Sequence, residues 1–260
     1  MPTEPPLPPE EMRALVGVTD PALFDNPSGG NALPEAGERA YGAVFDFGCG
    51  CGRLARKLIQ QQPQPTRYVG IDLHAGAIRW CNEHLVPLAP QFSFVHHDVF
   101  NPGFNPAAAA RVAPFPVESG SFDLVVAHSV FTHVLEDAAV HYLAECARAL
   151  HEGGALASTW FLFDKTLFPM MQSFQNSLYI NVGDPTNAVI YDRGWLRAAA
   201  AEVGLVVTRA WPPAIRGFHW QILFQPVAAG VTEIELPADE APLGSMPPPV
   251  LSVPPHLIGA

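Results

Sequence analysis

The chain has 260 residues, a formal net charge of −11 and 48% hydrophobic residues. About 70–75% of the unfolded surface of such a chain can be buried, which predicts one domain with a full core and excludes a wholly disordered chain. The acidic balance argues against a nucleic-acid partner, because a phosphate backbone would be repelled. No apolar run reaches the roughly 18–20 residues of a membrane span, and no leader sequence is visible at the start. We therefore expect a soluble, cytoplasmic protein with no membrane partner.

Proline marks both ends of the chain. Five prolines lie in residues 1–9 and seven in residues 229–260. Such segments favour extended polyproline conformations, which do not build a packed core. We expect a proline-rich arm or cap over residues 1–38, a main domain over 39–228 that contains a substrate lid at 164–190, and a tail over 229–260. Docking of these ends on the domain or on a partner subunit is left open, and so is a homodimer.

Between the ends, apolar runs that predict buried strands alternate with stretches whose apolar residues recur at helical spacing. This alternation indicates βαβ units, and therefore an α/β fold in three layers with a mostly parallel sheet. The link at 212–217 is too short for a crossover, so the last two strands should pair antiparallel. Gly153 and Gly154 are expected to end the longest helix. The expected strands are 43–47, 68–72, 92–95, 122–127, 155–163, 205–211 and 218–224, and the expected helices are 53–62, 78–85, 140–150 and 192–203.

A glycine-rich loop, Gly-Cys-Gly-Cys-Gly at residues 48–52, follows the first expected strand. Glycine allows a tight turn and a close approach of the backbone to a ligand. A dinucleotide fingerprint would need a third glycine where Arg53 stands, and a phosphate loop would need a G-K-[ST] sequence. Asp46 lies two residues before the loop, where it suits a cationic ligand better than a phosphate. We interpret the two loop cysteines as small residues that fit in a tight loop. They are not interpreted as zinc ligands, because a C-x-C pair alone lacks the other ligands of a zinc site.

Carboxylates also end the second and third expected strands. Asp72 is placed to accept both hydroxyls of a ribose, and Asp98 to accept an exocyclic amine. Open α/β sheets bind ligands at the carboxyl ends of their strands, where these groups meet Asp46. Together they predict a site for a nucleoside with a cationic tail. For Asp72 and Asp98, simple loop capping is the alternative.

Several segments resemble the motifs of class I S-adenosylmethionine-dependent methyltransferases of the small-molecule type. The resemblance covers about residues 40–225 in the order of that family. It implies a seven-stranded Rossmann-like sheet whose last pair is a β-hairpin, with S-adenosylmethionine as the cofactor. The segments are 44–53 for motif I, 70–72 and 97–99 after strands two and three, 121–134 for motif IV and the turn after it, and 149–154 before strand five.

The resemblance also implies a set of cofactor contacts, residue by residue. The methionine part, the ribose, the adenine and the sulfonium end would each have their own group of residues. These are Asp46, Gly48, Cys49 and Gly50 for the methionine part, Asp72 for the ribose, Leu73, Asp98 and Val99 for the adenine, and His128 and Ser129 for the sulfonium end.

A hydroxyl acceptor must lose its proton during methyl transfer, and histidine suits this task because its pKa lies near neutral pH. His133 matches a histidine that serves as general base in related O-methyltransferases; a role in shaping the pocket is the alternative. His128 is a second candidate. His96 and His97 lack a metal-binding pattern, so no metal is expected. The residues expected to bind the acceptor are Phe161, Phe163, Tyr179, His219 and Trp220, although packing on the sheet or in a dimer contact would explain them as well.

These patterns predict an S-adenosylmethionine-dependent methyltransferase whose acceptor is a small molecule, with a hydroxyl of a sugar or specialised metabolite as the first guess. No Asn/Asp-Pro-Pro-[Tyr/Phe] sequence follows the fourth strand. That motif usually accompanies methylation of amino groups and bases in this fold. A non-catalytic cofactor-binding partner subunit and a non-methylating enzyme with the same cofactor remain as alternatives.

Overall fold

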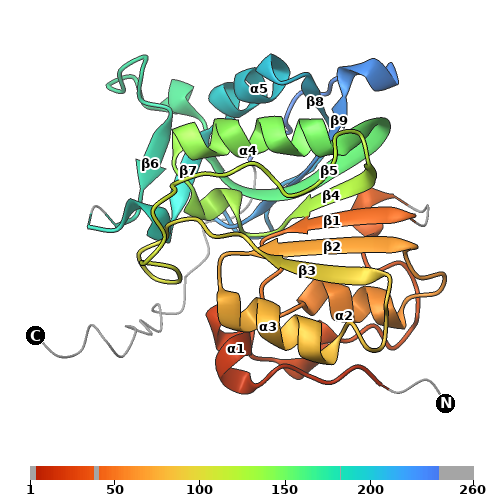
Figure 1. The fold of residues 1–260 in the computed structure, drawn as a ribbon. Coiled ribbons are helices and arrows are strands. Elements are labelled where there is room, and N and C mark those ends of the chain that lie inside the picture. Colours follow the sequence, from red (N-terminus) through yellow and green to blue (C-terminus); the bar gives the residue numbers. More distant parts are fainter. Residues whose placement is uncertain (1–3, 38–40, 182, 240–260) are drawn as a thin grey trace, which may run out of the picture.

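A computed structural model describes residues 4–37, 41–181 and 183–239. Helices cover both faces of a mixed sheet (Figure 1): α2 and α3 pack on one face, and α4 and α5 pack on the other. The strands are β1 (Ala43–Phe47), β2 (Arg67–Asp72), β3 (Phe92–His96), β4 (Phe122–Ala127), β5 (Leu150–Phe163), β6 (Ser177–Tyr179), β7 (Val189–Asp192), β8 (Leu205–Trp211) and β9 (Trp220–Pro226). The helices are α1 (Glu10–Leu15), α2 (Arg53–Gln60), α3 (Ala75–His84), α4 (Glu136–Ala149) and α5 (Arg193–Glu202).

The main path of the sheet runs β3-β2-β1-β4-β5-β9-β8. The first five strands are parallel, and β9 pairs antiparallel with both β5 and β8. In the centre, Phe45 of β1 lies between Val69 of β2 and Val125 of β4, and all three side chains are buried. A strand buried on both faces must be apolar at almost every position, which explains why the sequence marks these strands so clearly. The predicted Rossmann-like sheet with an antiparallel C-terminal pair is confirmed.

Two strands lie outside the expected set. Among the described residues the sheet has nine strands, because β6 and β7 form within the stretch that we expected to be an irregular lid. β5 is 14 residues long, and β9 pairs only with its Leu156–Trp160 segment. β7 pairs with the next three residues, Phe161–Phe163, and β6 adds to β7 (Figure 1). The extra strands supply hydrogen-bond partners to backbone groups that β5 would otherwise leave unpaired beyond β9.

Gly153 and Gly154 do not end the long helix, so that expectation was wrong. α4 ends at Ala149, and both glycines lie inside β5. The pairing of β4 with β5 shifts register here, from Phe122 opposite Leu150 to Leu124 opposite Ala155. A Cβ at Gly154 would lie 3.0 Å from the carbonyl oxygen of Phe122 and 2.8 Å from a methyl group of Leu150. Close approach of two strands, and not helix termination, therefore explains this glycine.

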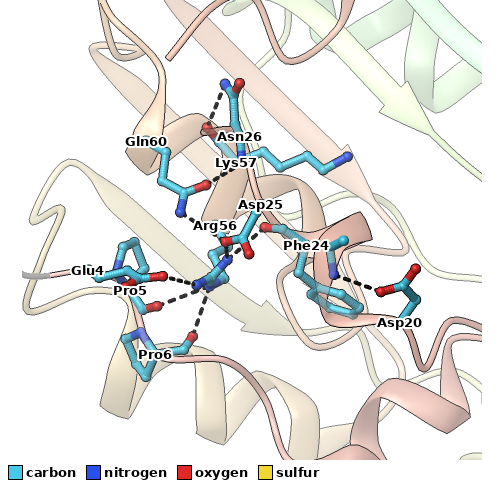
Figure 2. Close-up of polar contacts among 11 residues, drawn as sticks. Glu4, Pro5, Pro6, Asp20, Phe24, Asp25, Asn26, Arg56, Lys57 and Gln60 are labelled. Atoms are coloured by element: carbon cyan, nitrogen blue, oxygen red, sulfur yellow. Dashed lines mark hydrogen bonds and ion pairs between the residues drawn. The ribbon is translucent and has the colours of Figure 1, made fainter. Parts of the chain in front are cut away.

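The N-terminal arm, which we define as residues 4–37, packs against the domain despite its prolines. Phe24 is fully buried, and Leu33 is 2% exposed. The guanidinium of Arg56 on α2 fixes the arm, and its side chain is only 3% exposed (Figure 2). Its partners are the carbonyl oxygens of Pro5 (3.0 Å), Pro6 (3.3 Å) and Phe24 (3.0 Å) and the carboxylates of Glu4 (3.3 Å) and Asp25.

Replacing Arg56 by alanine should release the arm. We expect the free energy of unfolding to fall by roughly 3 kcal/mol, the lower end for a broken buried ion pair, because Asp25 is itself partly exposed. Urea denaturation followed by circular dichroism measures the change. The matched control is Arg197→Ala, since Arg197 holds Glu233 and Glu235 near the other end of the chain through exposed ion pairs. That variant should lose less than about 1 kcal/mol, and equal losses would contradict the prediction.

The C-terminal segment follows β9 and is described only as far as residue 239. Ile234 donates a backbone hydrogen bond to Val207 of β8 at 2.9 Å, and Arg193 of α5 donates to the carbonyl oxygen of Leu236 at 2.8 Å. This part of the expected tail therefore lies along β8 and α5. Most of its prolines fall in residues 240–260, outside the described residues, as do residues 1–3 of the arm.

Candidate functional site

The glycine loop between β1 and α2 folds back onto the end of β2. Gly48 and Gly50 have φ angles of +80° and +54°, in the left-handed region that favours glycine. The backbone N–H groups of Gly48 and Cys49 both donate to the carbonyl oxygen of Ile71, at 2.8 and 3.0 Å. A Cβ at Gly48 would lie 2.3 Å from a methyl group of Val130, so this loop has no room for a side chain there. The loop thus directs these two donors inward to the sheet.

Asp72, at the end of β2, ties the glycine loop to α3. Its two carboxylate oxygens accept the N–H groups of Gly50 and His74, each at 2.8 Å. Burial raises the pKa of Asp72, against these two hydrogen bonds, which lower it. Asp72 therefore performs the capping that we gave as its alternative role. Each carboxylate oxygen can accept a second hydrogen bond, so capping leaves acceptor capacity for a ligand hydroxyl.

Asp46, at the end of β1, faces a cavity of about 270 Å³ between the glycine loop and the N-terminal arm. The side chain is buried, and its Oδ2 accepts a hydrogen bond from the Tyr68 hydroxyl at 2.6 Å. Burial raises the pKa of Asp46 to about 6. The cavity walls also carry Glu35 from the arm, Arg53 and Lys57 from α2, and His128 from the end of β4. One small cavity thus combines two carboxylates with three groups that can be cationic.

A second group of residues gathers just after β4. Ser129 has a φ of +57°, and its N–H donates to Thr159 Oγ1 at 2.7 Å. Its Oγ lies 3.3 Å from Nε2 of His219, whose ring centroid lies 4.5 Å from that of Phe161. A non-glycine residue in the left-handed region costs free energy, so the surrounding hydrogen bonds hold Ser129 there. The structure therefore brings Ser129, Phe161 and His219 together.

Burial and three groups that can carry positive charge affect the pKa of His219. Burial lowers the pKa of His219, and the nearby His133, His128 and Arg53 lower it further. At pH 7 the ring of His219 is therefore neutral. Two of these groups, His128 and Arg53, also line the cavity of Asp46.

His133 follows β4 in a short 3₁₀ turn, Phe131–His133. Its Nδ1 lies 3.0 Å from the carbonyl oxygen of Thr186. A carbonyl oxygen can only accept, so Nδ1 carries the proton and the neutral ring presents its lone pair on Nε2. The exposed His133 is thus held in a tautomer that can accept a proton at Nε2.

The residues expected at the adenine have local partners of their own. Asp98 and Val99 share one partner, because Asn105 Nδ2 donates to Asp98 Oδ1 at 2.9 Å and to the Val99 carbonyl at 3.0 Å. The carbonyl of Leu73 accepts from His96 at 3.0 Å. Asp98 is exposed and Val99 is 5% exposed. These contacts shape the loop after β3 and leave the expected adenine contacts as predictions.

Three of the residues expected to bind the acceptor have side-chain contacts different from those of His219; these are Trp220, Phe163 and Tyr179. Trp220 is 1% exposed and packs in the core, with the guanidinium of Arg193 over its ring at 5.1 Å. His219 immediately precedes β9, which begins at Trp220, and its ring packs on Phe161 instead. Phe163 packs edge-on against Phe168, and Tyr179 is 43% exposed on β6. Trp220 therefore presents no surface to a ligand.

Sequence reasoning missed Glu35, Lys57 and Thr186 as parts of the site. Glu35 lies 11 residues before Asp46, in an arm whose docking the sequence left open, and it reaches His128 at 3.5 Å. Lys57 follows Arg53 by one helical turn, and this spacing is the one signal that could have placed both on the same face of α2. Thr186 contributes only a backbone carbonyl, which no side-chain pattern reveals.

Two features are absent from residues 4–37, 41–181 and 183–239. No group of three His, Cys, Asp or Glu side chains is arranged to hold a metal ion. No helix in these ranges is both long enough and apolar enough to cross a membrane.

Comparison with known proteins identifies the motif-bearing part of the chain. Residues 44–154 match the family model described as a methyltransferase domain. Among solved structures, a protein from Pyrococcus horikoshii OT3 matches with a TM-score of 0.51 and 14% identity, over 87% of this chain and 96% of that one. The pyocyanin biosynthetic protein PhzM matches with a TM-score of 0.51 and 15% identity, over 75% and 53%. An O-methyltransferase from neocarzinostatin biosynthesis gives a TM-score of 0.48 and 17% identity over 71% of this chain, which spans 49% of that structure.

Proposed function

Because the chain carries a class I S-adenosylmethionine-dependent methyltransferase domain at residues 44–154, we propose that it methylates a small molecule at a hydroxyl oxygen. The observation that carries this proposal is the His133 ring, whose Nδ1 lies 3.0 Å from the Thr186 carbonyl oxygen, so that Nε2 can accept a proton. His219 lies 3.3 Å from Ser129 Oγ, and its pKa, which burial lowers, is lowered further by His133 and by His128, which lines the cavity of Asp46. We infer from these placements that a base is available beside the cofactor site. The domain establishes the methyl donor, and the histidines support an acceptor that must lose a proton.

The residues of the glycine loop fit this donor better than they fit a phosphate-containing cofactor. The N–H groups of Gly48 and Cys49 are committed to Ile71, and that of Gly50 is committed to Asp72. Anion sites at helix N-termini need such donors to be directed outward. Asp46 and Asp72 instead add negative charge at the strand ends, which favours a cation and ligand hydroxyls. Asp46 would therefore lie near the methionine part of the cofactor, and Asp72 near its ribose.

The chain's own residues then have to position and deprotonate the acceptor. Bound S-adenosylmethionine supplies a methyl group already activated on a positively charged sulfur. Holding the acceptor oxygen about 3–3.5 Å from that carbon lowers the activation barrier, because the entropy cost of orienting the two reactants is met when they bind. Nε2 of His133 would accept the hydroxyl proton, while the Thr186 carbonyl keeps the ring oriented. His219 and Phe161 would form one wall of the acceptor pocket.

Two observations favour a small acceptor over a nucleic acid. The net charge of −11 opposes a polyanionic substrate at every face that carries carboxylates. The structural neighbour PhzM is described as a biosynthetic protein of pyocyanin, a small molecule. A sugar or another specialised metabolite is therefore our proposed acceptor class.

Cofactor binding should weaken in acid, because a cation binds the ionised form of Asp46. The pKa of this carboxyl is raised to about 6 by burial. Below that pH the folded protein holds a neutral Asp46, and the affinity for S-adenosylmethionine should fall by about tenfold per pH unit. Calorimetric titration at pH 7.5, 6.0 and 5.0 measures this slope. In Asp46→Asn the affinity should be low at pH 7.5 and nearly independent of pH, and an unchanged slope in that variant would assign the effect to another group.

The proposed function can be tested before the acceptor is identified. Native mass spectrometry of the purified full chain should show co-purified S-adenosylmethionine or S-adenosylhomocysteine. Extracts of small metabolites are then incubated with the protein and methyl-labelled cofactor, and products are separated by mass. A product heavier by one methyl group on oxygen is the expected result. Label transfer to nitrogen or to nucleic acid, or a product that gains no methyl group, would contradict the proposal.

A further inference from the structure

The N-terminal arm supplies one wall of the cavity at the glycine loop. Leu33 and Glu35 of the arm face Asp46 and Arg53 across it. We propose that Glu35, from the arm, receives the ammonium of the cofactor's amino-acid end in this cavity. The arm is then part of the binding site and not a tail attached to it. This inference rests on the proposed function for the identity of the cofactor.

Local packing fixes the position of Glu35. It lies in a short 3₁₀ turn, Pro34–Ala36, between Leu33, which is 2% exposed, and Ala36, which is 8% exposed. Both neighbours are buried in the core cluster that includes α2 and α3. Just before the turn, the N–H of Ala32 donates to Gln61 Oε1 at 2.8 Å. The backbone on either side is therefore anchored, and the carboxylate points to His128 at 3.5 Å.

The charges in the cavity match the two ends of an α-amino acid. Glu35 and Asp46 provide carboxylates, and Arg53 and Lys57 provide cations from one face of α2. Burial raises the pKa of Glu35, but the hydrogen bond from His128, a backbone hydrogen bond and the charges of His128 and Lys57 together outweigh it, and the net pKa is below the ordinary value. Glu35 is therefore ionised at neutral pH. A phosphate would meet two carboxylates here and a simple cation would meet two positive groups, whereas a zwitterion satisfies both signs.

Another part of the arm covers the glycine loop. A Cβ at Gly50 would lie 2.5 Å from a methyl group of Val16, so the arm lies directly over the loop. Arg56 fixes the arm on both sides of this point, at Pro5 and Pro6 before Val16 and at Phe24 and Asp25 after it (Figure 2). The end of the arm that carries Glu35 is held separately through Gln61. The cavity therefore has a rigid wall before any ligand enters.

Two ligands that differ only in the amino-acid end test this inference in the full chain. S-adenosylhomocysteine carries the ammonium and carboxylate, whereas 5′-methylthioadenosine has the same nucleoside without them. Calorimetry should show that Glu35→Gln weakens binding of S-adenosylhomocysteine by about tenfold or more, and leaves binding of 5′-methylthioadenosine within about twofold of wild type. The matched control is Glu233→Gln, which removes an ion pair to Arg197 far from the cavity and should change neither affinity.

The possible outcomes distinguish a wrong assignment of Glu35 from a wrong proposed function. If Glu35→Gln binds S-adenosylhomocysteine as wild type does, or loses both ligands equally, the assignment of Glu35 is wrong while the cofactor assignment stands. If the wild-type chain binds neither ligand, the proposed function itself is contradicted. Hydrogen exchange of the wild type needs no variant: the amides of residues 31–37 should exchange more slowly with S-adenosylhomocysteine than with 5′-methylthioadenosine. Equal exchange with both ligands would overturn the inference.

Discussion

Replacing Asp72 by alanine should lower both the stability of the protein and its affinity for the cofactor. The substitution removes the acceptor for the N–H groups of Gly50 and His74. Hydrogen bonds to a charged group contribute about 1.5–3 kcal/mol each, so the free energy of unfolding should fall by roughly 3 kcal/mol. The glycine loop loses the hydrogen bond of Gly50 to the end of β2, and affinity for S-adenosylhomocysteine should fall by about a hundredfold. Urea denaturation and calorimetry measure the two effects.

The Asp72→Asn variant separates the two roles of this residue. An asparagine oxygen can still accept from one of the two N–H groups, while the other meets an amide nitrogen. Because burial raises the pKa of Asp72, a neutral side chain is tolerated better here than at an exposed position. We expect an intermediate loss of stability and a large loss of affinity. If alanine at this position leaves both quantities at the wild-type level, Asp72 neither organises the loop nor binds the ribose.

Replacing His133 by alanine should abolish most of the turnover with the true acceptor. Removal of a general base typically costs a factor of about 10²–10⁴ in rate. Affinity for S-adenosylhomocysteine should stay within about twofold of wild type, because we propose that His133 contacts the acceptor and not the cofactor. Steady-state rates between pH 5.5 and 9 with a labelled methyl group provide the measurement.

His141 provides a matched control for this variant. It also holds a backbone carbonyl, that of Ala113 at 3.1 Å, but it lies on α4, which covers a face of the sheet. His141→Ala should keep the wild-type rate and pH profile. Full turnover in His133→Ala would end the general-base assignment, and His219 would then be the next histidine to test.

The sequence predicted the centre of the fold because the centre is determined locally. The central parallel strands β1 and β4 are buried on both faces, so a run such as residues 122–127 is apolar at every position except Asp123. The glycines of the loop were predictable for a similar reason, since Gly48 and Gly50 adopt backbone conformations that other residues disfavour. Asp46 and Asp72 were found because strand ends meet at one edge of the sheet.

The rest of the site depends on contacts that no local pattern encodes. The proline content of the arm predicted an extended segment and left its docking open. In the structure, one arginine on α2 binds carbonyl groups that a proline-rich chain cannot pair with itself. Glu35 could be identified as a cavity residue only from the docked position of the arm. Gly154 was misread because a glycine after a helix usually ends it, whereas here the following strand begins at once.

Because β5 is 14 residues long, it pairs with two different strands along its length. Residues 156–160 hold the C-terminal hairpin, whereas 161–163 hold β7 and, through it, the segment whose Thr186 orients His133. Changes in the loops around β6 and β7 should therefore alter the proposed acceptor pocket and leave undisturbed the strands at whose ends we propose that the donor binds. Exchanging residues 164–188, which connect β5 to β7, between proteins of this architecture is thus a rational route to new substrates of the proposed reaction.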